Sequence, residues 1–217
     1  MQLAAIEMSK IIYLTQVYRP TGQLYIPEAI AKIVQRYSFV KHPSIEDLTK
    51  NVQTFGVGKF ENSQIQEMSI YNDGVIVSAD SNTNIIDAFL SDVLTWSKEN
   101  LGLVQTITAK PEKHYESNIV IKSKVDMTNV TKPRLGVLET FHKIWKRGYF
   151  GNAFVPASFN LDCDKSLFRG LRKPIHFGFE RRVGVPFEEN IFHSTAPLTT
   201  DDHLYLLERL EALAEEI

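Results

Sequence analysis

Residues 68–78, MSIYNDGVIVS, set the fold class of this 217-residue chain. The pair Asp73-Gly74 separates two short runs that are rich in β-branched and aromatic residues. Asp-Gly between such runs is among the strongest short-range signals for a β-hairpin, because both residues tolerate the backbone angles of a tight turn. The segment therefore predicts two antiparallel strands joined at Asp73-Gly74.

A capped helix is predicted directly after this hairpin. Thr83 or Asn84 can act as its N-cap, and Gly102 is placed to end it. The apolar residues between these ends are Ile85, Ile86, Phe89, Leu90, Val93, Leu94 and Trp96. Their helical spacing predicts one broad face that is buried against the strands.

The same order of hairpin and helix recurs at the end of the chain. Residues 175–195 predict a second hairpin, and a final helix is predicted from Thr199 or Thr200. A shift of 117 residues aligns Thr83 with Thr200 and Phe89 with Leu206. Two explanations remain open: an internal duplication, or a common arrangement that occurs twice. The near-absence of identical residues favours the second.

The remaining segments complete an α+β chain. They predict a hairpin over residues 11–26, helices from Pro27, Ser44 and Pro133, and strands over 118–125 and 159–164. We therefore expect antiparallel hairpins and sheet, with amphipathic helices packed on one face. A single domain over residues 1–217 is expected, with similar halves 1–104 and 118–217 joined by 105–117 as its internal division.

Composition excludes several classes of protein. With 43% hydrophobic and 23% charged residues the chain can bury a full core without disulfides, and its one cysteine, Cys163, permits no internal bridge. No apolar run approaches the roughly 20 residues that cross a bilayer, and no secretion signal begins the sequence. These observations predict a cytoplasmic protein that does not span a membrane.

The last third of the chain reverses its charge. Residues 132–182 contain eleven Lys and Arg against four acids, a net charge of +7. Residues 183–217 contain eight acids against Arg209 alone, a net charge of −7. Blocks of one sign are typical of partner surfaces, although the whole chain carries only −2.

These two blocks supply the candidate partner-binding residues. Glu208, Glu211 and Glu215 recur at helical spacing and predict one exposed acidic stripe. The basic candidates are Lys143, Lys146, Arg147, Arg169, Arg172 and Lys173. Aromatic residues among them make nucleic-acid binding an alternative, but a sequence pI near 6.3 disfavours it.

A metal site is a further hypothesis. Strand alternation places His176 and Glu180 on one face, and pairing of Phe192 with Phe179 adds His193 to that face. Two imidazoles and a carboxylate can hold a divalent metal for hydrolysis. The competing interpretation, three polar residues on the solvent face of a hairpin, is favoured because no recognised metal-ligand motif is present.

Together these patterns predict a non-enzymatic interaction or accessory protein that acts through protein contacts. The expected partner is another protein or a second copy of this chain, and no cofactor is expected. A metal-dependent hydrolase or nuclease using His176, Glu180 and His193 is the first alternative. A nucleic-acid-binding module is the second.

Overall fold

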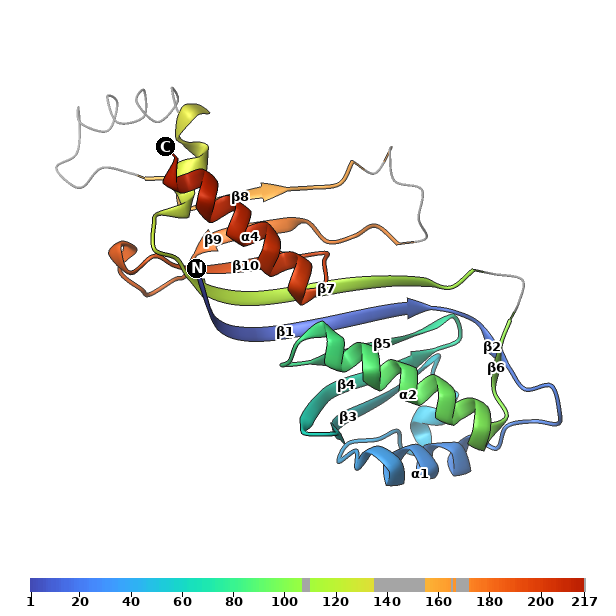
Figure 1. The fold of residues 1–217 in the computed structure, drawn as a ribbon. Helices are drawn as coiled ribbons and strands as arrows, with labels where there is room; N and C mark the ends of the chain where they lie inside the picture. The colour runs from blue at the N-terminus through green and yellow to red at the C-terminus, as the bar shows by residue number, and fades with distance from the viewer. Residues whose placement is uncertain (107–109, 135–154, 165, 167–171, 217) are drawn as a thin grey trace.

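The computed structural model describes residues 1–106, 110–134, 155–164, 166 and 172–216. Within them, one antiparallel sheet of eight strands has the order β3-β4-β5-β1-β7-β10-β9-β8, and a separate ribbon pairs β2 with β6 (Figure 1). The strands are β1 (Gln2–Leu14), β2 (Val17–Tyr18), β3 (Val52–Phe60), β4 (Ser63–Tyr71), β5 (Gly74–Ala79), β6 (Val104–Gln105), β7 (Glu112–Lys122), β8 (Ser158–Leu161), β9 (Phe177–Arg181) and β10 (Ile191–Ala196).

Helices cover one face of this sheet. Figure 1 shows α2 and α4 lying on the same side of the strands. The helices are α1 (Ile26–Tyr37), α2 (Thr83–Leu101) and α4 (Thr200–Glu215), with 3-10 turns η1 (Glu46–Thr49), η2 (Met127–Arg134) and η3 (Phe187–Glu189). The predicted α+β class is confirmed. Among the described residues, no helix is long and apolar enough to cross a membrane.

The hairpin at Asp73-Gly74 forms as predicted. Tyr71 pairs with Gly74 at the turn, and β5 leads through a short connection into α2. The N-cap of α2 is Asn82, however, whose side chain accepts a hydrogen bond from the Asn84 amide at 2.8 Å. Gly102 ends the helix in the left-handed conformation with φ of 67°, which glycine adopts without steric cost.

Three predicted elements differ from the structure. The hairpin over residues 11–26 is wrong, because Ile11 and Ile12 lie within the 13-residue strand β1, buried between β5 and β7. The helix from Ser44 is reduced to η1, since the chain enters β3 at Val52. The strand over 159–164 ends at Leu161. The helix predicted from Pro133 lies mostly outside the described residues.

The sheet has an internal pseudo-two-fold arrangement at the pairing of β1 with β7. Ser9 pairs with Ser117 across this seam. On the outer sides Ser9 pairs with Ala79 of β5, and Ser117 pairs with Ala196 of β10. All four side chains are fully buried. Ala79 and Ala196 are also 117 residues apart, so the shift seen in the sequence relates equivalent positions in space.

The two helices meet above this seam through reciprocal hydrogen bonds. The Thr200 amide donates to Thr83 Oγ1 at 2.9 Å, and the Thr83 amide donates to Thr200 Oγ1 at 3.1 Å. Both threonines are buried. Asp201 adds hydrogen bonds from the Asn82 and Asn84 side-chain amides, each at 2.9 Å. One buried amide in the first turn of each helix is therefore satisfied by the other helix.

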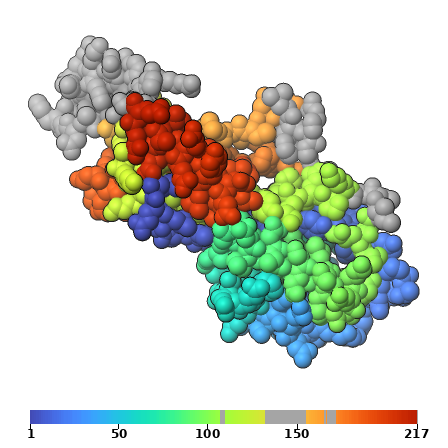
Figure 2. All heavy atoms as spheres, viewed as in Figure 1, coloured from blue at the N-terminus to red at the C-terminus, as the bar shows by residue number. Residues whose placement is uncertain are grey.

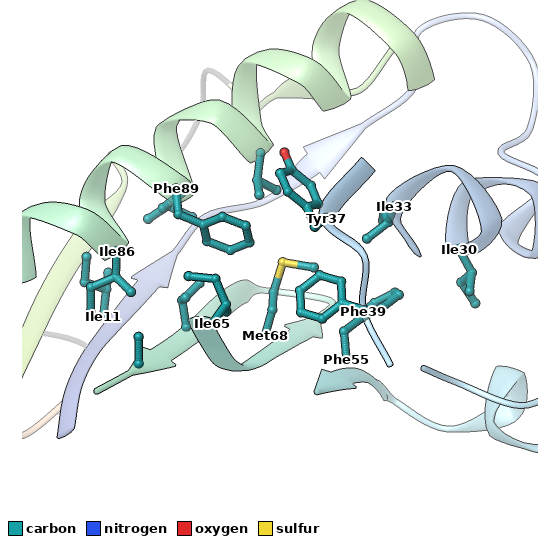
Figure 3. Packing of buried hydrophobic residues seen from close by; sticks show 14 residues of the cluster. Ile11, Ile30, Ile33, Tyr37, Phe39, Phe55, Ile65, Met68, Ile86 and Phe89 are labelled. Carbon is teal, nitrogen blue, oxygen red and sulfur yellow. The ribbon is translucent and has the colours of Figure 1, made fainter. Parts of the chain in front are cut away.

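Each half has its own apolar core beneath its helix. The first core packs Phe89 of α2 against Ile65 and Met68 of β4, and α1 closes its far side with Tyr37 (Figure 3). The second core packs Leu207 of α4 against the β9 and β10 side chains. Burial of these faces is the main stabilising contribution to the fold.

Replacing the reciprocal threonines by valine tests the helix junction. Thr83→Val and Thr200→Val each keep the side-chain shape but leave a buried amide without its acceptor, so each should lower the free energy of unfolding by about 1–2 kcal/mol. Because the two bonds share one site, the double variant should lose less than the sum. Urea denaturation measures this, with the exposed Thr95→Val of α2 as the matched control. Full additivity would show that the threonines act independently.

Candidate functional site

The structure brings two of the three predicted metal-site residues together. His193 lies directly opposite Glu180, with Nδ1 3.5 Å from Oε1. The predicted register was wrong by two residues, since Phe192 pairs with Arg181 and not with Phe179. A shift of two keeps each residue on its expected face.

His176 takes no part in that contact. It lies in the chain just before β9, and its ring is close to Gly178. A Cβ atom in place of the glycine hydrogen would come within 3.2 Å of the histidine Nε2. The second acidic neighbour of His193 is Glu7 of β1, whose Oε2 is 3.4 Å from the histidine Nε2. The other oxygen of Glu7, Oε1, accepts a hydrogen bond from Arg182 at 2.6 Å. Within the described part of the chain, no group of three or more His, Cys, Asp or Glu could hold a metal ion. The cluster consists of the Arg182–Glu7 ion pair and the close contacts of His193 with Glu7 and Glu180, on the sheet face opposite the helices.

Four cations of the basic block, Arg172, Lys173, Arg181 and Arg182, have acidic partners within the chain. Arg172 lies 3.6 Å from Glu116, which also accepts from Lys10 at 2.8 Å. The other pairs are Lys173 with Asp162, Arg181 with Asp126, and Arg182 with Glu7. The candidates Lys143, Lys146, Arg147 and Arg169 lie outside the described residues. None of the described basic residues pairs with an acid of the C-terminal block.

The predicted acidic stripe on α4 needs a correction at Glu211. Its side chain is buried, with 7% of the residue exposed, and accepts from the Met1 ammonium at 2.5 Å, Ser123 Oγ at 2.7 Å and the Lys124 amide at 2.9 Å. Burial raises its pKa, but these donors outweigh burial and hold the pKa below its usual value. Helical spacing could not reveal that the N-terminus and the β7–η2 connection pack on this side of α4.

The outer face of α4 carries two exposed apolar side chains and several charged residues, most of them acidic. Tyr205 is 64% exposed, and Leu213, which its sequence spacing predicts to be buried, is 48% exposed. Figure 2 shows α4, in red, uncovered on this side of the molecule. The surrounding charged residues are Glu208, Arg209, Glu215 and Glu216. Among the described residues, these three glutamates form no ion pair, and two of them lie at the helix C-terminus, where the dipole disfavours anions.

A buried polar trio distinguishes the second half from the first. His203 of α4 lies between Ser194, with Nε2 2.8 Å from Oγ, and Ser117, with Nδ1 3.2 Å from Oγ. Ser194 donates its proton to the Gly178 carbonyl oxygen, so His203 must donate from Nε2 and accept at Nδ1. The 117-residue shift places apolar Ile86 and Val77 at the positions of His203 and Ser194. The local sequence around His203 does not predict this trio, and the signal that could have revealed it is the polar residue at a position where the 117-residue shift places apolar Ile86.

Burial keeps this histidine neutral. The trio is closed to solvent, since all three residues are fully buried. Burial, with a smaller effect of His193, lowers the pKa of His203 to about 4. The trio therefore satisfies polar groups inside the core and offers no surface for a substrate.

Comparisons with known proteins find a similarity only among solved structures. No family model matches the chain, and no curated protein matches it. A solved chain described as Methanococcus jannaschii TBP is similar in structure, with 12% sequence identity and a TM-score of 0.44. The alignment covers 98% of this chain and 99% of that chain.

The buried histidine should make stability depend on pH. Its folded pKa lies below the ordinary value of 6.5, so the unfolded chain binds the proton more strongly. Its contribution is full above about pH 6.5 and is lost as pH falls toward 4, by up to about 3 kcal/mol.

The double variant His203→Ile, Ser194→Val carries the residue types of the first half and should flatten this pH dependence. Chemical denaturation at several pH values measures it, with the exposed His42→Gln as control. An unchanged slope between pH 6.5 and 4 in the double variant would assign the pH dependence to other groups.

Proposed function

We propose that this chain is a non-enzymatic binding protein that contacts a partner protein through the outer face of α4. The proposal rests on two exposed side chains of α4, Tyr205 and Leu213. The same helix face carries glutamates that form no ion pair with a described residue. A surface with apolar anchors and a charged rim is typical of protein interfaces. The complementary partner surface is basic with an apolar centre.

The two kinds of residue have different roles in such a contact. Tyrosine is among the residues that contribute most to binding energy, because its ring buries a large area with few rotatable bonds. The rim acids Glu208 and Glu215 attract a basic partner over distance and exclude acidic ones. Affinity should then depend on Tyr205 and Leu213, and association rate and salt dependence on the acids.

Nucleic-acid binding has less support. A protein that binds phosphates needs cations available for them, whereas Arg172, Lys173, Arg181 and Arg182 each have an acidic partner in the chain. The same pairing disfavours a second copy of this chain as the partner, because these four cations would have to leave their own acidic partners to meet the α4 acids. A different protein with a basic surface is the better match.

A cationic peptide probe tests the proposal. The probe is a labelled synthetic peptide of about 18 residues with Lys and Leu at helical spacing, followed by fluorescence anisotropy. Binding should weaken about tenfold between about 50 mM and about 500 mM NaCl, because screening shortens the reach of the acids. The pair Glu208→Lys, Glu215→Lys should weaken it about tenfold at low salt, and Tyr205→Ser by a similar factor.

Matched controls separate this face from general acidity. Glu188→Lys with Glu189→Lys makes the same change of charge in η3, outside α4, and should leave most of the affinity. An equal loss of peptide affinity in the η3 double variant and the α4 double variant would contradict a specific site on α4. Tighter binding of a short DNA duplex than of the peptide would favour the nucleic-acid alternative, and salt-sensitive dimers in sedimentation would make a second copy the partner.

A further inference from the structure

The first half contains a cavity of about 510 Å³ that its own side chains leave unfilled. It lies between the C-terminal part of α2, the ends of β4 and β5, and the β2–β6 ribbon. Its walls are mostly apolar and include Val17, Ile70, Val75, Leu94, Leu103 and Val104. Sites for small molecules have volumes of about 300–1,000 Å³ and walls of this kind.

The equivalent place in the second half is filled by the chain itself. The shift of 117 residues relates Leu94 of the cavity wall to Glu211, which holds the Met1 ammonium and Ser123. Met127, in the segment that follows β7, is buried in the second core. In the first half the segment that follows β1 lines the cavity with Thr15 and Val17 instead. Because folded cores leave few voids larger than a water molecule, a hollow of this size, at a place that described residues of the second half fill, points to an occupant.

Polar groups at the cavity define the chemistry of that occupant. Lys98 is the one charged residue among the described lining residues, and it is exposed at the edge. Tyr13 Oη accepts a hydrogen bond from Gln105 Nε2 at 2.7 Å, and Ser97 adds a hydroxyl. A small molecule with an apolar tail and one anionic headgroup would place its tail among the aliphatic walls and its headgroup beside Lys98.

We propose that this cavity binds a small amphiphilic carboxylate, with the apolar tail inside and the carboxylate paired with Lys98. The site is separate from the outer face of α4 and does not depend on the function proposed for that face.

Isothermal titration calorimetry with three ten-carbon probes tests this inference. The probes are decanoate and decyltrimethylammonium, each below its micelle concentration, and decan-1-ol below its solubility limit. Decanoate should bind the wild-type chain saturably and about tenfold more tightly than decyltrimethylammonium. Lys98→Gln should remove this preference while leaving decan-1-ol binding unchanged, and Lys59→Gln on β3 should keep it.

A cavity-filling variant separates internal binding from adsorption to the surface. Ser97→Trp places an indole in the cavity and should weaken all three probes about tenfold, because the tail then has no room. Thr95→Trp, at the exposed edge of the same helix, is a second filling variant if Ser97→Trp fails to fold. Unaltered decanoate binding in the folded filling variant, or no saturable binding of any probe, would overturn the proposal. A preference that survives Lys98→Gln would overturn the role of Lys98.

Discussion

The pairing of β1 with β7 is the constraint on which the rest of this structure depends. These two long central strands join the sheets of the two halves into one, and Ser9 meets Ser117 at its pseudo-two-fold centre. Only small side chains fit there, because the first turns of α2 and α4 lie above and exchange hydrogen bonds through Thr83 and Thr200. The seam thereby fixes both helices on one face of the sheet.

The two halves use this common scaffold differently. The first half has an all-apolar core at Val77 and Ile86 and leaves a cavity beside α2, whereas the second half has a buried histidine network and fills the corresponding place with its own chain. Within the second half, cations near β9 are paired with acids elsewhere in the chain. Glu208, Glu215 and Glu216 on the outer face of α4 form no ion pair with a described residue. We therefore propose the outer face of α4 as the place where a partner protein binds and the cavity as the place where a ligand binds.

Local sequence signals predicted the elements that local physics determines. The Asp73-Gly74 turn, the apolar stripe of α2 and the 117-residue relation between the helices all appear in the structure. The sequence could not predict contacts between distant segments. The burial of Glu211 depends on the N-terminus, Glu7 reaches His193 from another strand, and β1 is a single strand because neighbours on both sides cover it. The sequence pattern predicted Glu208, Glu211 and Glu215 as one exposed stripe, but it could not predict that contacts with distant segments bury Glu211.

Amide NMR spectra of the full chain with the cationic peptide test whether a partner binds to the outer face of α4, because they locate the contact without a substitution. The peptide should shift the amide signals around Tyr205, Glu208 and Leu213, with little change at Lys10 and His193 on the opposite face of the sheet. Shifts confined to that opposite face, with α4 unaffected, would contradict binding to the outer face of α4.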